Sequence, residues 1–297
     1  MRRFGAAHRL PVRAPFRLDF TADALRRLAA NIVDVVDPDG TYYRALTDER
    51  STELLAIRAA GARAVEVRAT GRDGERWLPA VSRMIGARVD LTQWYEHSAR
   101  VAWLAPIAAR FRGLKPPRYP TLWEACAHAV LFQQISIHAA AAIMRRAVEL
   151  LGEPVAAASV RCIAFPAAQR WLAAGDADLR TVGISRNKIE HLRSVAGAFA
   201  SGTIDERELE SLPTPEAAAR LATIRGIGAW SASVVLLRGM GRLDTFPLRD
   251  SGVARSLTLL AGDTHVDESG LLERLGDVRG MLYYHLLLGR MATNRPE

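Results

Sequence analysis

Cysteine and long apolar runs are scarce in this sequence. Cys126 and Cys162 are its two cysteines and stand in apolar surroundings, so we expect reduced thiols in a core. Two thiolates cannot hold an iron–sulfur cluster, which needs about four. No apolar run approaches the roughly 20 residues that span a bilayer, and no signal-peptide pattern follows Met1. We therefore expect a cytoplasmic protein with no membrane partner.

Lysine is scarce as well, whereas arginine is abundant. The chain has 40 Lys and Arg against 32 Asp and Glu, so its net charge is 40 − 32 = +8. Lys115 and Lys188 are the only lysines. A basic balance favours a polyanionic partner. With 297 residues, of which 49% are hydrophobic, the chain is long enough for two or three domains.

Strand and helix patterns mix in the first third of the chain. Residues 1–14 are basic and lack periodicity, which predicts a loose basic arm. Residues 41–46 and 64–69 alternate with the period of two that is typical of half-buried strands. Two helices are also predicted, at residues 21–33 and 78–85. We therefore predict that residues 15–94 form an α+β domain with an antiparallel sheet.

From residue 95 onward the strand pattern disappears. Thr121 is predicted to cap a helix that runs to about Gln133, with Glu124 as its capping-box partner. Other helices are predicted from apolar periodicity and from glycine and proline stops, at residues 101–111, 136–151, 167–174, 176–182, 186–200, 215–224, 231–238, 251–260, 267–275 and 281–290. Residues 95–297 are therefore predicted to form an all-helical domain.

A Gly-Ile-Gly turn joins two of these helices within residues 215–238. Gly226 and Gly228 permit positive φ and a close approach of the backbone to a ligand. The N-terminus of the following helix offers unpaired N–H groups to an anion such as phosphate. Taken alone, the tripeptide favours an ordinary turn between helices. Its context favours the phosphate-binding interpretation, because Trp230 follows it and Asp250 comes after the second helix.

The succession of helix, hairpin, helix and aspartate resembles the helix-hairpin-helix motif of the DNA glycosylase superfamily. Other segments resemble the bacterial DNA-3-methyladenine glycosylase II family, at residues 130–136, 165–170, 179–192 and 279–287. The resemblance implies a TBP-like sheet domain followed by a helical glycosylase body. It also implies a monofunctional enzyme of base excision repair, which flips alkylated purines such as 3-methyladenine out of damaged double-stranded DNA.

Two other functions are compatible with the same residues. The protein could be a glycosylase for a deaminated or oxidised base, because the pocket walls come from several helices whose packing the sequence does not show. It could also be a non-catalytic binder of damaged DNA that uses the hairpin only as a phosphate anchor. Asp250 separates this last function from the others, because an anchor needs no carboxylate.

Asp250 is the candidate catalytic residue. Breaking an N-glycosidic bond builds positive charge on the sugar, and a nearby carboxylate stabilises that charge or activates water. Aspartate is also a common N-cap, and Asp250 directly precedes a predicted helix. Both roles can hold together, because a helix N-terminus favours negative charge.

The resemblance also implies positions for the other contacts. Trp230 stands where bifunctional relatives carry a nucleophilic lysine, which predicts an enzyme that forms no imine with DNA. The tryptophan itself is either a wall of the base pocket or a core residue. Val234, Ser251 and Leu287 stand where the best-known member has aromatic residues, which leaves the lesion open. The predicted base pocket comprises Trp230, Gln133, Val234 and Leu287. The predicted DNA contacts are Gln134, Arg225, Gly226, Ile227, Gly228 and Ala229.

Gln134 occupies the family's wedge position, where an apolar residue is expected, so it is either the wedge or an exposed glutamine. No organic cofactor is predicted. The resemblance allows a monovalent cation, Na⁺ or K⁺, on the main-chain carbonyls of Ala222, Ile224 and Ile227. We expect a monomer associated with the bacterial nucleoid.

Overall fold

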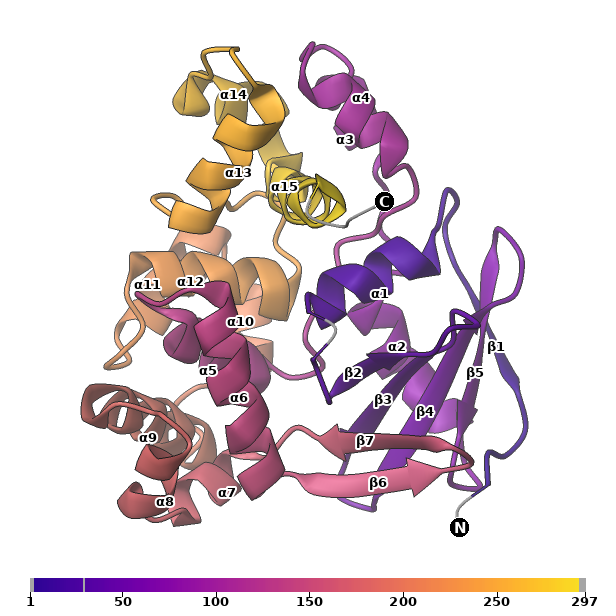
Figure 1. The fold of residues 1–297 in the computed structure, drawn as a ribbon, viewed down its shortest axis with the longest axis vertical. Coiled ribbons are helices and arrows are strands. Elements are labelled where there is room, and N and C mark those ends of the chain that lie inside the picture. Colours follow the sequence, from indigo (N-terminus) through magenta and orange to yellow (C-terminus); the bar gives the residue numbers. More distant parts are fainter. Residues whose placement is uncertain (1–2, 29, 294–297) are drawn as a thin grey trace.

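The computed structural model describes residues 3–28 and 30–293, and it places a sheet domain beside a helical body (Figure 1). The sheet has five antiparallel strands in the order β1-β5-β4-β3-β2. The strands are β1 (His8–Pro11), β2 (Asp34–Val36), β3 (Tyr42–Thr47), β4 (Thr52–Ala59) and β5 (Ala64–Ala69). The two strands that alternation predicted are β3 and β5, so the α+β class of this region is confirmed.

Two helices cover one face of this sheet. α1 (Leu18–Arg26) and α2 (Leu78–Met84) pack against Ile57 and Val67, which are fully buried. α1 ends well before residue 33, where the sequence predicted its end. The physical reason is Asn31, whose side-chain oxygen accepts hydrogen bonds from the backbone N–H groups of Val33 and Asp34 and so favours a turn over a helix.

The predicted loose arm at residues 1–14 is wrong for its middle part. His8–Pro11 is strand β1, which pairs with β5 along a register that sets Leu10 opposite Val65. Leu10 is buried in the core between the sheet and its helices. A four-residue edge strand shows no periodicity of its own and forms because the edge of β5 offers unpaired N–H and C=O groups. Residues 1–2 lie outside the described residues.

The body that follows is built mainly from helices, as predicted. Thr121 caps α5 by accepting a hydrogen bond from the backbone N–H of Glu124 at 3.2 Å. The helices are α3 (Thr92–Ser98), α4 (Leu104–Arg110), α5 (Leu122–Phe132), α6 (Ile137–Leu151), α7 (Ala168–Ala173), α8 (Asp176–Thr181), α9 (Arg186–Ala200), α10 (Glu206–Ser211), α11 (Thr214–Ala222), α12 (Ala229–Val235), α13 (Ser251–Ala261), α14 (Glu268–Leu275) and α15 (Gly280–Thr293).

The prediction that residues 95–297 are all-helical is wrong at one place. After α6 the chain forms a hairpin of β6 (Glu153–Ala157) and β7 (Val160–Ala164). This hairpin covers the sheet face opposite α1 and α2, where Val155 and Cys162 pack with Leu54 (Figure 1). Its apolar residues alternate with period two, but the segment is short and its partner is the distant sheet. Tertiary packing therefore decides its conformation.

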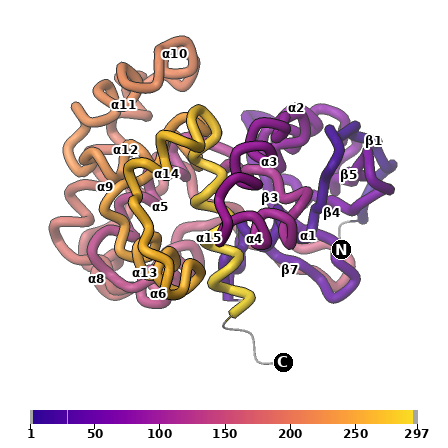
Figure 2. The backbone as a smooth tube through the Cα atoms, turned by 90° about the horizontal axis from the view of Figure 1, so that it is seen from above, coloured from indigo at the N-terminus to yellow at the C-terminus, as the bar shows by residue number. Residues whose placement is uncertain are grey.

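The helices form two cores, and α15 lies between α13 and the sheet domain (Figure 2). One core gathers α5, α6, α9, α11 and α12, and the other gathers α3, α4, α13, α14 and α15. Trp94, at the predicted domain boundary, is fully buried in the second core, and the centre of its ring lies 4.5 Å from the ring centre of His285. In the part of the chain that is described, no helix has the length and apolar character to cross a membrane.

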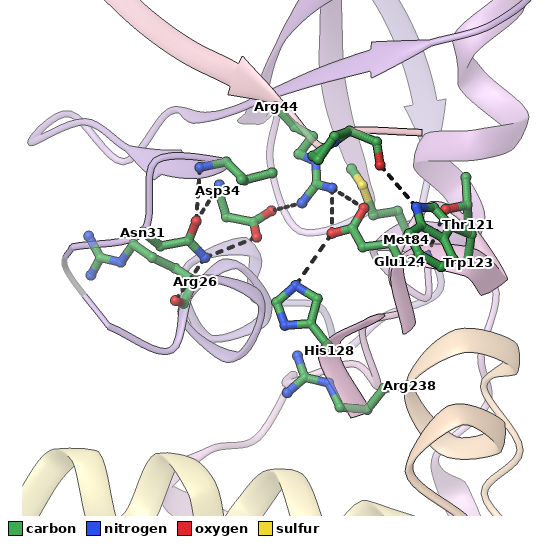
Figure 3. A network of polar contacts seen from close by, with 12 residues as sticks. Arg26, Asn31, Asp34, Arg44, Met84, Thr121, Trp123, Glu124, His128 and Arg238 are labelled. Carbon is green, nitrogen blue, oxygen red and sulfur yellow. Dashed lines mark hydrogen bonds and ion pairs between the residues drawn. The ribbon is translucent and has the colours of Figure 1, made fainter. Parts of the chain in front are cut away.

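A buried charge cluster fixes the sheet domain against α5 (Figure 3). Arg44 of β3 donates to Asp34 of β2 at 2.6 Å and to Glu124 of α5 at 2.7 Å. All three side chains are almost fully buried. Burial raises the pKa of Glu124 to about 7, against the opposing effect of Arg44. The cluster thus links the two parts of the molecule through groups that are expensive to bury unpaired.

Candidate active site and DNA interface

A cavity of about 1000 Å³ opens where the two helical cores meet the end of α1. Its walls come from α5, the α5–α6 turn, α12, the start of α13 and α15. Among the described residues that line it, Asp250 is the only carboxylate, and the arginines are Arg26, Arg27, Arg249, Arg255 and Arg290. A cavity with this charge balance attracts a polyanion and presents one negative group to it.

Asp250 stands at the N-terminus of α13 and lines the cavity. One carboxylate oxygen, Oδ1, accepts hydrogen bonds from the backbone N–H groups of Gly252 at 2.7 Å and Val253 at 3.0 Å. The predicted N-cap role is confirmed. The helix N-terminus stabilises the negative charge of this half-buried carboxylate and fixes its orientation.

Trp230 holds the other oxygen of the same carboxylate. Its indole Nε1 donates to Asp250 Oδ2 at 3.0 Å, while the ring lines the cavity from the first turn of α12. The residue therefore contacts Asp250 and lines the cavity, and it is half-buried, with part of its surface packed against the first helical core. No sequence pattern indicated this hydrogen bond, because 20 residues separate the two side chains.

The predicted hairpin is present between α11 and α12. Gly226 has φ +99°, and a Cβ there would lie 2.5 Å from the Cβ of His191, so glycine is required by both conformation and space. Gly228 is the exposed N-cap of α12, and a Cβ there would meet only open space among the described residues. Arg225 is exposed and pairs with Glu190 at 2.6 Å. Exposed pairs of this kind are weak enough to yield to a phosphate.

The α5–α6 turn is tied to the hairpin by side chains. Gln133 lines the cavity and donates from Nε2 to the carbonyl of Gly226 at 2.9 Å and to Ser231 Oγ at 2.7 Å. Lys188 donates from Nζ to the carbonyls of Leu131 at 2.7 Å and of Gln133 at 2.9 Å. The charge of this lysine thus offsets the partial negative charge at the C-terminal end of α5, and its two hydrogen bonds hold the turn in place.

Gln134 lies at the tip of this turn. It is exposed and has φ +57°, a conformation that glutamine rarely adopts. Ile135 beside it is 38% exposed, which is unusual for a large apolar side chain. The turn therefore presents one polar and one apolar residue side by side at the mouth of the cavity.

Val234 and Leu287 line the cavity as predicted. The lining residues that the sequence did not indicate include Arg27, His128, Phe132 and Tyr283. Phe132 precedes Gln133 on α5, so its position could have been inferred from its neighbour. Arg27 belongs to the sheet domain, and no sequence pattern relates it to a site more than two hundred residues away.

The carbonyls predicted to hold a cation belong to the end of α11 and the hairpin. The carbonyl of Ile224 accepts a hydrogen bond from the N–H of Ile227 at 3.0 Å, which leaves a second lone pair for an ion. The residues therefore fit a monovalent cation in donor type. Among the described residues, no group of three or more His, Cys, Asp or Glu side chains could hold a metal.

Residues 127–276 match the model of the HhH-GPD superfamily base excision DNA repair protein. The DNA-3-methyladenine glycosylase of Bacillus subtilis is 31% identical over 171 residues, which cover 58% of this chain and 56% of that protein. DNA-3-methyladenine glycosylase 2 of Escherichia coli is 31% identical over 145 residues, covering 48% of this chain and 50% of that protein. The chain thus spans about half the length of these relatives.

Two solved structures are similar over nearly the whole chain. A 3-methyladenine DNA-glycosylase from Archaeoglobus fulgidus superposes with a TM-score of 0.81 at 22% identity, covering 97% of this chain and 100% of that one. An 8-oxoguanine glycosylase/lyase from Clostridium acetobutylicum, in complex with DNA, gives 0.75 at 16% identity, covering 98% and 99%. At such identities the likeness establishes the fold alone.

Proposed function

The chain belongs to the HhH-GPD superfamily of base excision DNA repair proteins, and from this premise we propose that it is a monofunctional DNA glycosylase that releases alkylated purines such as 3-methyladenine from double-stranded DNA. One observation carries the proposal. Asp250 accepts hydrogen bonds from three N–H groups and lines a cavity. Among the described residues, the other charged side chains that line this cavity are arginines. A binder that used the hairpin only as an anchor would not need this carboxylate.

The reaction replaces the bond between C1′ and the base by a bond to water. In the transition state positive charge develops on the sugar ring. Asp250 is fixed in orientation before the substrate arrives, so it can stabilise that charge without reorganisation. It also accepts a proton from the attacking water. A base that already carries a positive charge leaves as a neutral molecule, and one carboxylate is then sufficient catalysis.

The cavity requires a nucleotide that has left the duplex. Backbone N–H groups at Gly228 and Ala229 are our proposed phosphate contacts, together with Arg225. Gln134 is the proposed wedge that fills the gap, and the exposed side chain of Ile135 adds an apolar surface beside it. A cation on the carbonyls of Ala222, Ile224 and Ile227 would add positive charge next to the same phosphate.

A lyase reaction would require an amine at the flipped nucleotide, and we propose that none is present. Burial lowers the pKa of Lys115 to about 8, which would suit a nucleophile, but its Nζ donates to the carbonyl of Val89 at 2.7 Å. The Nζ of Lys188 is bound to two carbonyls. No lysine lines the cavity within the described part of the chain.

Borohydride reduction during turnover tests this point. We expect an intact abasic site and no protein–DNA adduct on a denaturing gel. An adduct, or strand nicking without added alkali, would show an amine nucleophile and refute the monofunctional assignment.

The variant Asp250→Asn tests the proposal as a whole. Asparagine caps helices as well as aspartate does, so folding and DNA binding should be preserved. Loss of the negative charge should lower single-turnover release of 3-methyladenine by roughly 10²–10⁴-fold, the range typical of a lost catalytic group. Wild-type rates in this variant would remove Asp250 from the mechanism. A parallel panel of deaminated and oxidised bases measures the preference for alkylated purines.

We also infer that the sheet domain is of the TBP-like type and that the protein acts as a monomer in the cytoplasm, with the nucleoid. The antiparallel sheet with α1 and α2 on one face supports the first point. Sedimentation of the protein with and without DNA would test the second.

A further inference from the structure

Arg27 is placed inside the cavity by the sheet domain. It follows the last residue of α1, has φ +57°, and its backbone N–H still bonds to the carbonyl of Asp23 at 2.8 Å. This turn directs the side chain away from the sheet and into the same cavity that Asp250 lines. The charges of Arg27 and Asp250 interact across it.

The guanidinium is held by two aromatic residues that also line the cavity. Nη2 donates to the hydroxyl of Tyr283 at 2.6 Å, and the central carbon lies 5.5 Å from the ring centre of Phe132. The buried Nε has no hydrogen-bond partner among the described residues. A half-buried cation with an unused donor, in a cavity built to hold a base, suits a ligand with a hydrogen-bond acceptor.

The charge of this group is permanent. Burial acts to lower the pKa of Arg27, but Tyr283, Tyr119 and Asp250 outweigh it and the pKa stays above its usual range. Asp250 faces the sugar in the proposed reaction. The base would then lie in the rest of the cavity, which Arg27, Phe132 and Tyr283 line.

Damaged purines differ in the charge that they bring to this position. In DNA, 3-methyladenine and 7-methylguanine carry a positive charge, whereas 1,N6-ethenoadenine and hypoxanthine are neutral and present ring nitrogen or oxygen acceptors. A fixed cation repels the first group in a cavity of low dielectric constant. It donates to an acceptor on the second group without that repulsion.

The leaving-group chemistry points the same way. When C1′–N9 breaks, the electron pair goes to the base, so a neutral base departs with negative charge that a cation stabilises. Water supplies a hydroxyl to C1′, and its remaining proton ends on the base. Arginine contributes as a hydrogen-bond donor and not as an acid. A cationic base departs as a neutral molecule and gains nothing from Arg27.

We propose that Arg27 is a specificity-determining residue, which makes the pocket favour neutral damaged purines with acceptor edges, such as 1,N6-ethenoadenine and hypoxanthine, over cationic methylpurines. This inference rests on the proposed glycosylase function and changes the ranking of its substrates: 3-methyladenine remains a substrate, but neutral damaged purines gain the larger acceleration. It assigns to the sheet domain a direct part in choosing the lesion.

The experiment measures single-turnover release from matched duplexes that carry 7-methylguanine or 1,N6-ethenoadenine, each divided by its spontaneous rate. For the wild-type protein we expect a larger acceleration for 1,N6-ethenoadenine. In Arg27→Gln the acceleration ratio should shift at least tenfold toward 7-methylguanine, which corresponds to about 1.4 kcal/mol. Arg27→Lys keeps the charge and should shift it much less.

Arg255→Gln is the matched control, because Arg255 is an exposed arginine at the edge of the same cavity. It should weaken binding to both duplexes alike and leave the ratio unchanged. An unchanged acceleration ratio in a folded Arg27→Gln variant overturns the proposal. A larger acceleration for 7-methylguanine by the wild-type protein also overturns it, and this measurement needs no variant. If the wild-type protein releases neither base, the proposed glycosylase function fails instead.

Discussion

The hydrogen bond from Trp230 to Asp250 provides the sharpest test of how the site works. In Trp230→Phe an aromatic ring remains, but the donor to Oδ2, now at 3.0 Å, is lost. A hydrogen bond to a charged group contributes about 1.5–3 kcal/mol, and about 1.4 kcal/mol corresponds to a tenfold change in rate. The two bonds to Oδ1 persist in the variant, so only part of the orientation of the carboxylate is lost.

We therefore expect the single-turnover rate of base release to fall about tenfold, with DNA affinity within about twofold of the wild-type value. The assay is release of 3-methyladenine under saturating enzyme, with affinity from fluorescence anisotropy on the same duplex. Trp103→Phe is the control for the general cost of the replacement, because Trp103 is half-buried in the other core and does not line the cavity. A wild-type rate would refute the reasoning. A fall in affinity at constant rate would instead show that Trp230 acts chiefly as a wall of the base pocket.

The remaining predictions concern the hairpin and the charge cluster. Gly228→Asp should weaken binding to all duplex sequences alike, because its carboxylate repels the phosphate. Gly228→Ala should bind like the wild type, because it adds a methyl group into open space at an ordinary φ. If both variants bind equally well at moderate salt, the hairpin is only a turn. Glu124 has a folded-state pKa of about 7 against an ordinary 4.5, so its contribution to stability is present below pH 4.5 and is lost as the pH rises through 7. The loss is at most about 3.5 kcal/mol at about 1.4 kcal/mol per pH unit. Urea unfolding from about pH 4.5 to 8 should therefore show a slope in the wild type that is absent from Glu124→Gln. Parallel curves for the two proteins would place the titration elsewhere.

Local sequence signals determined the elements whose stability is local. Thr121 and Asp250 were identified as N-caps because a cap needs only its own side chain and the next turn of backbone. The hairpin was identified because Gly226 satisfies a backbone requirement that no other residue meets easily. Each of these features is written within a few consecutive residues.

Features that depend on distant partners were decided by the tertiary structure. β1 and the β6–β7 hairpin are strands because the sheet offers them an edge or a face, and segments this short do not decide their own conformation. The pocket is the same case on a larger scale. Arg27 from the sheet domain, Trp230 from α12 and Tyr283 from α15 converge only when the two parts of the molecule dock. The sequence by itself therefore indicated the class of protein and the candidate carboxylate Asp250, whereas the charge and shape of the cavity were decided by packing between segments more than two hundred residues apart.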